Sequence, residues 1–80
     1  MSVISNIFRH LVGKPLMEVR GGKPIATFNK LQFWVYPELC RVQMHEALSH
    51  CDERSRVFQM AWAKAHFGPS ILLVREATTR

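Results

Sequence analysis

The longest regular pattern in the sequence is a helical one that covers residues 37–66. Placed at 100° per residue, eight of its apolar side chains share one stripe: Cys40, Met44, Ala47, Leu48, Cys51, Phe58, Trp62 and Ala65. Pro37 suits the first turn of a helix, and Gly68 followed by Pro69 ends one. The rest of the fold must therefore be built around this helical region.

A single helix of thirty residues would span ~45 Å, which is too long for a globule of 80 residues. Residues 49–52 include serine and aspartate, whose side chains cap helices. We therefore expect a break there, with helices near residues 37–49 and 52–66. One unbroken helix is the alternative, and it would favour a dimer.

Between residues 15 and 36 the pattern changes to short alternating runs, which predict strands. Residues 16–20 and 24–28 flank Gly21 and Gly22, a pair suited to a two-residue hairpin turn. Residues 31–36 alternate as well, and a strand there would place two large aromatic side chains on the same face.

The two ends of the chain complete the expected fold. Residues 1–13 predict an amphipathic helix that ends at Gly13, and residues 70–76 predict a final strand with a short apolar run. The order is then α-β-β-β-α-α-β. This order predicts an α+β fold: a small single domain with a four-stranded, mostly antiparallel sheet and helices packed on one face.

The chain is basic, with 11 Lys and Arg residues against six Asp and Glu residues and a formal net charge of +5 at pH 7. In residues 1–37, five basic residues stand against Glu18 alone. This imbalance favours acidic partners, such as nucleic acid, an anionic lipid surface or an acidic protein groove. It excludes a polyanion mimic that would decoy nucleic-acid-binding proteins.

Two cysteines, Cys40 and Cys51, are too few for a disulfide scaffold. They would lie ~16 Å apart on one continuous helix, which forbids a bridge. Only two helices folded back on each other would permit one. We expect reduced core thiols and a cytoplasmic location. The longest apolar runs, of four residues, are far too short to cross a membrane.

Residue types that bind metals or catalyse reactions are present, but their spacing is wrong. The candidate zinc ligands follow one another at intervals of five, five and one: Cys40, His45, His50 and Cys51. Zinc ligands on a helix are three or four residues apart. His50, Cys51 and Asp52 point about 100° apart on a helix, so they form no catalytic triad. We therefore expect no metal, no cofactor and no enzymatic activity.

The first functional hypothesis is a small non-catalytic interaction protein that binds a larger protein assembly and modulates or inhibits it. Aromatic side chains with arginine at their margin are typical of interface hot spots. The expected contact residues are Arg20, Lys23, Trp34 and Tyr36. The alternative interpretation is that Trp34 and Tyr36 cover a small cluster against the chain termini. By size and class alone, the chain is analogous to the host-directed inhibitors that phages and mobile elements encode.

The second hypothesis is nucleic-acid binding, through a basic hairpin at residues 20–30 or a degenerate helix-turn-helix at residues 43–63. The side chains that would contact nucleic acid are Arg20, Lys23, Lys30, Arg54, Arg56 and Gln59. Two acids, Asp52 and Glu53, count against the helix-turn-helix because they would lie where phosphates approach. A membrane-surface role for residues 2–12 is the third hypothesis. A homodimer would also fit, because so short a chain builds a small core.

Overall fold

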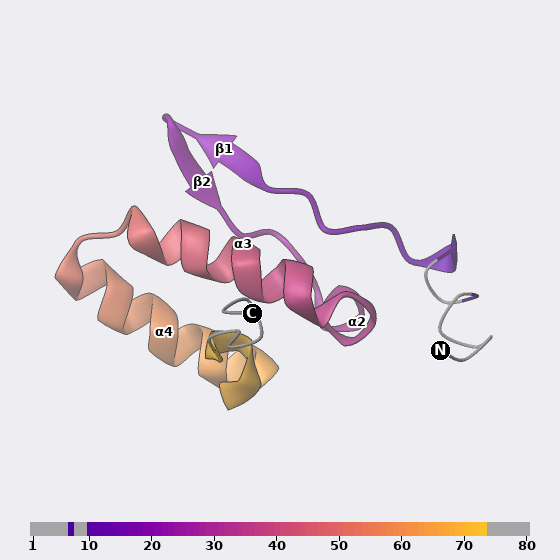
Figure 1. Cartoon of the computed structure of the whole chain (residues 1–80). Helices are drawn as coiled ribbons and strands as arrows, with labels where there is room; N and C mark the ends of the chain where they lie inside the picture. The colour runs from indigo at the N-terminus through magenta and orange to yellow at the C-terminus, as the bar shows by residue number, and fades with distance from the viewer. Residues whose placement is uncertain (1–6, 8–9, 74–80) are drawn as a thin grey trace, which may run out of the picture.

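The computed structural model of the 80-residue chain describes residue 7 and residues 10–73 (Figure 1). The elements follow in the order β1 (Glu18–Arg20), β2 (Lys23–Ile25), α2 (Lys30–Val35), α3 (Pro37–Ser49), α4 (Glu53–Phe67) and the 3-10 helix η1 (Pro69–Leu72). α3 lies between the β-hairpin and α4, and it contacts β2, α2, α4 and η1. α3 and α4 run in opposite directions (Figure 1).

The four-stranded sheet expected from the sequence is wrong, because the described residues contain a two-stranded antiparallel hairpin and three α-helices. The hairpin pairs Val19 with Pro24, and each strand is three residues long. Its turn residues, Gly21 and Gly22, have φ angles of 57° and 79°. A tight type I′ turn needs positive φ at both central residues, and glycine adopts it without steric strain. The glycine pair therefore marks the turn that the sequence predicts.

The strand expected at residues 31–36 is also wrong, because α2 occupies most of that segment. Asn29 provides the physical reason. Its side-chain oxygen accepts from the Gln32 backbone N–H at 2.7 Å, and the Gln32 side chain accepts from the Asn29 N–H at 3.0 Å. This reciprocal capping box satisfies two backbone donors that a helix start otherwise leaves unpaired.

The helical region is interrupted at residues 50–52, between α3 and α4, within the stretch of capping residues. Asp52 caps α4 by accepting from the Ser55 N–H at 2.7 Å. Arg56 closes the other side of the turn, since its guanidinium donates to the carbonyls of Leu48 at 3.2 Å and Cys51 at 2.8 Å. Leu48 lies in the last turn of α3 and Cys51 in the turn that follows, so Arg56 ties α4 to the end of α3.

The final strand expected at residues 70–76 is wrong in its described part, because residues 69–72 form η1. Gly68, with a φ of 92°, redirects the chain, and Pro69 starts the 3-10 turn. Ile71 is fully buried there. A short apolar run suits any buried segment, and here it fills the end of the helical layer. Residues 74–76, and most of the helix expected at residues 1–13, lie outside the described residues.

The core lies between the helices rather than on a sheet. Its buried members come from α3, α4 and η1: Cys40, Met44, Leu48, Ala63 and Ile71. Partly buried side chains, most of them aromatic or aliphatic, surround this set: Ala26, Phe28, Phe33, Met60, Phe67 and Leu72. So small a core leaves much apolar surface to be covered in another way.

The segment before the hairpin, residues 12–16, is fixed by side chains from later in the chain. Four of them donate to its backbone carbonyls: Tyr36 to Val12 at 3.3 Å, Gln32 to Gly13 at 3.2 Å, Gln43 to Pro15 at 2.7 Å and Thr27 to Leu16 at 2.9 Å. Pro15 is buried in this segment. The segment therefore lies against α2 and α3 without forming a strand or a helix of its own.

Candidate functional site

The described residues leave much of their apolar surface exposed. Seven hydrophobic residues are buried, whereas twelve large hydrophobic residues are exposed. Single exposed apolar side chains are ordinary in soluble proteins, so their position matters more than their number. Three of them lie on α4, namely Val57, Phe58 and Trp62, and Trp62 borders a hollow.

An apolar groove of about 210 Å³ lies between the hairpin and the two long helices. Its lining comes from β2 and the residue after it, α3, the turn and α4: Pro24, Ile25, Ala26, Met44, Ala47, Leu48, Cys51, Gln59 and Trp62. Among the described residues, no charged side chain lines the groove. Small-molecule sites usually exceed about 300 Å³. The groove is therefore of a size to hold one or two apolar side chains of a partner.

Trp62 lies at the rim of the groove with 43% of its surface exposed. Its ring stacks on His66 at a centroid distance of 4.2 Å and meets the edge of Phe67 at 6.0 Å. Phe67 in turn packs against Phe28 at 4.9 Å and Phe33 at 5.9 Å. Because these rings hold Trp62 in place, little conformational entropy would be lost when a partner covers it.

The structure separates the four contact residues predicted from the sequence. Arg20 and Lys23 lie at the hairpin turn, whereas Trp34 and Tyr36 lie at the opposite end of α3 (Figure 1). Trp34 is exposed on α2. Tyr36 is buried and donates its hydroxyl hydrogen bond to Val12, so it supports the fold and offers little contact surface. The shared aromatic face disappears because α2 is a helix.

Both basic residues of the hairpin have an acidic neighbour. Glu18 accepts from Arg20 at 2.8 Å, and this hydrogen bond raises the pKa of Arg20 above its ordinary value. The pKa of Asp52 is lowered, first by the hydrogen bond from the Ser55 N–H and further by the charges of Lys23 and Arg56. The hairpin is therefore less positive than its basic residues alone indicate.

The residues of the nucleic-acid hypothesis do not form one surface either. Lys30 begins α2 and Arg54 is exposed on α4. Arg56 is half-buried and bonded to the carbonyls of the turn, and Gln59 lines the apolar groove. The antiparallel arrangement of α3 and α4 also leaves no recognition helix that projects away from its partner helix (Figure 1).

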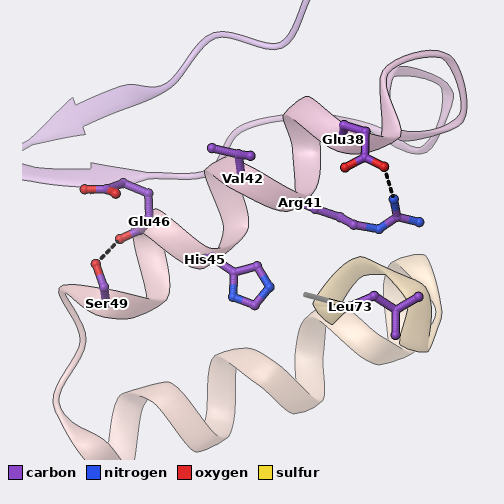
Figure 2. A pocket seen from close by; sticks show the side chains of 7 residues that line it. All are labelled: Glu38, Arg41, Val42, His45, Glu46, Ser49 and Leu73. Carbon is purple, nitrogen blue, oxygen red and sulfur yellow. Dashed lines mark hydrogen bonds and ion pairs between the residues drawn. The ribbon is translucent and has the colours of Figure 1, made fainter. Parts of the chain in front are cut away.

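A second hollow, of about 330 Å³, lies between α3 and the end of η1. Figure 2 shows its lining, which is mostly polar: Glu38, Arg41, Val42, His45, Glu46, Ser49 and Leu73. Arg41 pairs with Glu38 at 3.2 Å and donates to the Ser70 carbonyl at 2.7 Å, which ties α3 to η1. Ser49 donates to the Glu46 carbonyl of its own helix (Figure 2).

The described residues contain no group of three His, Cys, Asp or Glu side chains that could hold a metal ion. Burial raises the pKa of the Cys40 thiol to about 11, which keeps this sulfur protonated and unreactive near neutral pH. Cys51 is half-buried, and both thiols are free. Within residues 10–73, no helix combines the length and the apolar character that a membrane crossing requires.

The stripe in the sequence groups Phe58 and Trp62 with Cys40 and Met44, which are buried in the structure. The break at residues 50–52 resets the helical phase, so both side chains are exposed. The sequence does carry a signal for this exposure: α4 has apolar residues on more than one side, and Met60 and Ala63 occupy the side that faces the core.

Comparison of the chain with known protein families, with curated proteins and with solved structures finds no match, so no family is assigned to it.

Proposed function

We propose that this chain is a small non-catalytic interaction protein that binds apolar side chains of a larger protein in the groove between β2, α3 and α4. The observation that carries the proposal is the exposed Trp62, held by His66 and Phe67 at the rim of an uncharged hollow. Large, immobilised aromatic side chains beside a pocket are the usual anchors of protein interfaces. Binding there would modulate or inhibit the partner by covering the surface that enters the groove.

Charge supports an acidic partner. The chain carries a formal net charge of +5, and Lys23 directly precedes the groove residue Pro24. Because the groove has no charged lining, apolar contacts would supply most of the affinity. The net positive charge of the chain would instead speed the encounter with a negatively charged protein.

A protein partner fits better than nucleic acid. Phosphate binding needs available cations, and two of the side chains expected to contact nucleic acid are already engaged: Arg20 with Glu18 and Arg56 with backbone carbonyls. The two free thiols support a reducing compartment, so the proposal keeps the cytoplasm as its location. In size and class, such a protein would be analogous to the host-directed inhibitors that phages and mobile elements encode.

The test immobilises the full chain, passes cell lysate over it with and without nuclease, and compares three variants. Trp62→Ala removes the anchor, and Gln59→Glu places a negative charge in the groove while keeping the side-chain length. Trp34→Ala is the matched control, because it removes an exposed tryptophan from α2, away from the groove. Circular dichroism checks that each variant is folded.

We expect a stoichiometric protein that survives nuclease treatment and raised salt, is lost with Trp62→Ala and Gln59→Glu, and is retained with Trp34→Ala. Loss of that protein with Trp34→Ala alone would contradict binding in the groove and would favour the contact surface expected from the sequence, which includes Trp34. Loss of all bound material on nuclease treatment would favour nucleic-acid binding. Its affinity would then fall steeply with salt.

A further inference from the structure

α4 is apolar on its outer side as well as on the side that faces the core. The inner side contributes Met60, Ala63 and Phe67 to the core and its surroundings. The outer face, defined as Arg54, Val57, Phe58, Ala61 and Ala65, occupies an arc of about 100° at 100° per residue. All five of its members are exposed. Val57 and Phe58 have 64% and 65% of their surfaces exposed. An apolar helix face normally packs against another element.

We propose that two copies of this chain associate by packing the outer faces of α4 antiparallel to each other. α4 lies at the margin of the molecule, with α3 beside it (Figure 1), so a second helix has access to this face. None of the outer-face residues lines the groove, so this dimer does not depend on the partner proposed for the groove.

The side chains of the outer face are complementary in size to one another. Ala61 is close to the middle of α4, and Ala65 follows it one turn later. Small residues at a helix crossing let the two axes approach to about 8 Å. When the second helix runs antiparallel, Phe58 of each copy meets these alanines of the other. A twofold axis creates this contact twice, as an isologous interface requires.

Charge favours the antiparallel orientation. Glu53 and Lys64 are eleven residues apart, so they lie within about 20° of each other on one edge of α4. Among the described residues neither of them forms an ion pair. In an antiparallel twofold pair like edges meet, which places Glu53 of one copy near Lys64 of the other at both ends. In a parallel twofold pair opposite edges would meet, so Glu53 and Lys64 of the two copies would not be paired.

The orientation also suits Arg54. It lies in the first turn of α4, so it would lie near the last turn of the second helix, where unpaired carbonyls make the helix end negative. The net charge of +5 opposes association, but charges outside the interface are screened beyond about 8 Å at physiological salt. One helix per copy is a small interface, so we expect a weak, concentration-dependent dimer.

The experiment is sedimentation velocity on the full chain over a concentration series at physiological salt. The wild type should shift from monomer to dimer as concentration rises. Ala61→Glu should remain monomeric, because it places a charge at the helix crossing. Gln59→Glu should dimerise like the wild type, since it alters the groove alone. If the lysate experiment finds no partner for the groove, the sedimentation result therefore still tests the dimer.

A charge exchange tests the orientation without touching the apolar contact. Glu53→Lys and Lys64→Glu should each weaken the dimer about three- to tenfold, because each places like charges at both ends. The double variant should recover most of that loss. A wild type that stays monomeric at every concentration would overturn the proposal, and so would an Ala61→Glu variant that dimerises normally. A double variant as weak as the single ones would overturn the antiparallel arrangement.

Discussion

Ile71 provides the sharpest test of how the helical layer is closed. Its side chain is fully buried against the core formed by α3 and α4, although it belongs to a four-residue 3-10 helix near the end of the described chain. Replacing it by alanine removes three methyl or methylene groups, worth about 2.4 kcal/mol at ~0.8 kcal/mol each. The cavity left behind raises the expected cost to about 3–4 kcal/mol.

This loss is large for a chain of this size. A domain of 80 residues is stable by about 4–12 kcal/mol. Ile71→Ala should therefore shift the urea midpoint strongly, as followed by far-UV circular dichroism, with an unchanged dependence on urea. Ile71→Val, which removes one group, should cost about 1 kcal/mol.

Leu73→Ala is the matched control, since Leu73 lies two residues further along and has 59% of its surface exposed. Its cost should stay within about 0.5 kcal/mol. If Ile71→Ala cost less than about 1 kcal/mol, η1 would not close the core as described. Equal costs for the two alanine variants would refute the same reasoning, because burial would then make no difference.

Two further predictions concern titrating groups. The lowered pKa of Asp52 means that its cap stabilises the fold above the ordinary carboxylate pKa of about 4, and that this contribution is lost as pH falls through the lower folded pKa. Asp52→Asn should flatten that part of the stability-versus-pH curve in urea titrations, and an unchanged curve would contradict the cap. Burial raises the pKa of Cys40 to about 11, so its contribution to stability should be lost above about pH 9, where the unfolded thiol ionises. In the folded protein at pH 8, iodoacetamide should modify Cys51 before Cys40 in mass spectra, and the reverse order would show that Cys40 is accessible.

The sequence located features that depend on local chemistry. The glycine pair marks the hairpin turn, because positive φ at Gly21 and Gly22 is a property of the residues themselves. Capping side chains mark the interruption between α3 and α4 for the same reason. Asn29 and Gln32 held an equally local signal, a cap pair three residues apart, and the alternation of residues 31–36 concealed it.

The groove could not be located from local patterns. It exists because β2 packs on α3 while Trp62 approaches from α4, and no sequence spacing records that meeting. Residues 71–74 show a related limit: a continuous apolar run indicates burial, but it does not distinguish a strand from a tight turn. The stripe that joins Phe58 to Cys40 assumes a constant helical phase through residues 37–66, and the break at residues 50–52 removes that phase.

The attachment of residues 12–16 has a consequence for how the segment would appear in solution. Side chains of α2, α3 and neighbouring residues bond its carbonyls, while amide hydrogen exchange reports on N–H groups alone. The segment would therefore exchange rapidly, like a loose tail, although its path is fixed at four points. The four bonds end on backbone carbonyls, so replacement of Lys14 by another residue should leave them intact. The attachment of this segment depends on the path of its backbone, so its exposed side chains can vary without loss of the four hydrogen bonds.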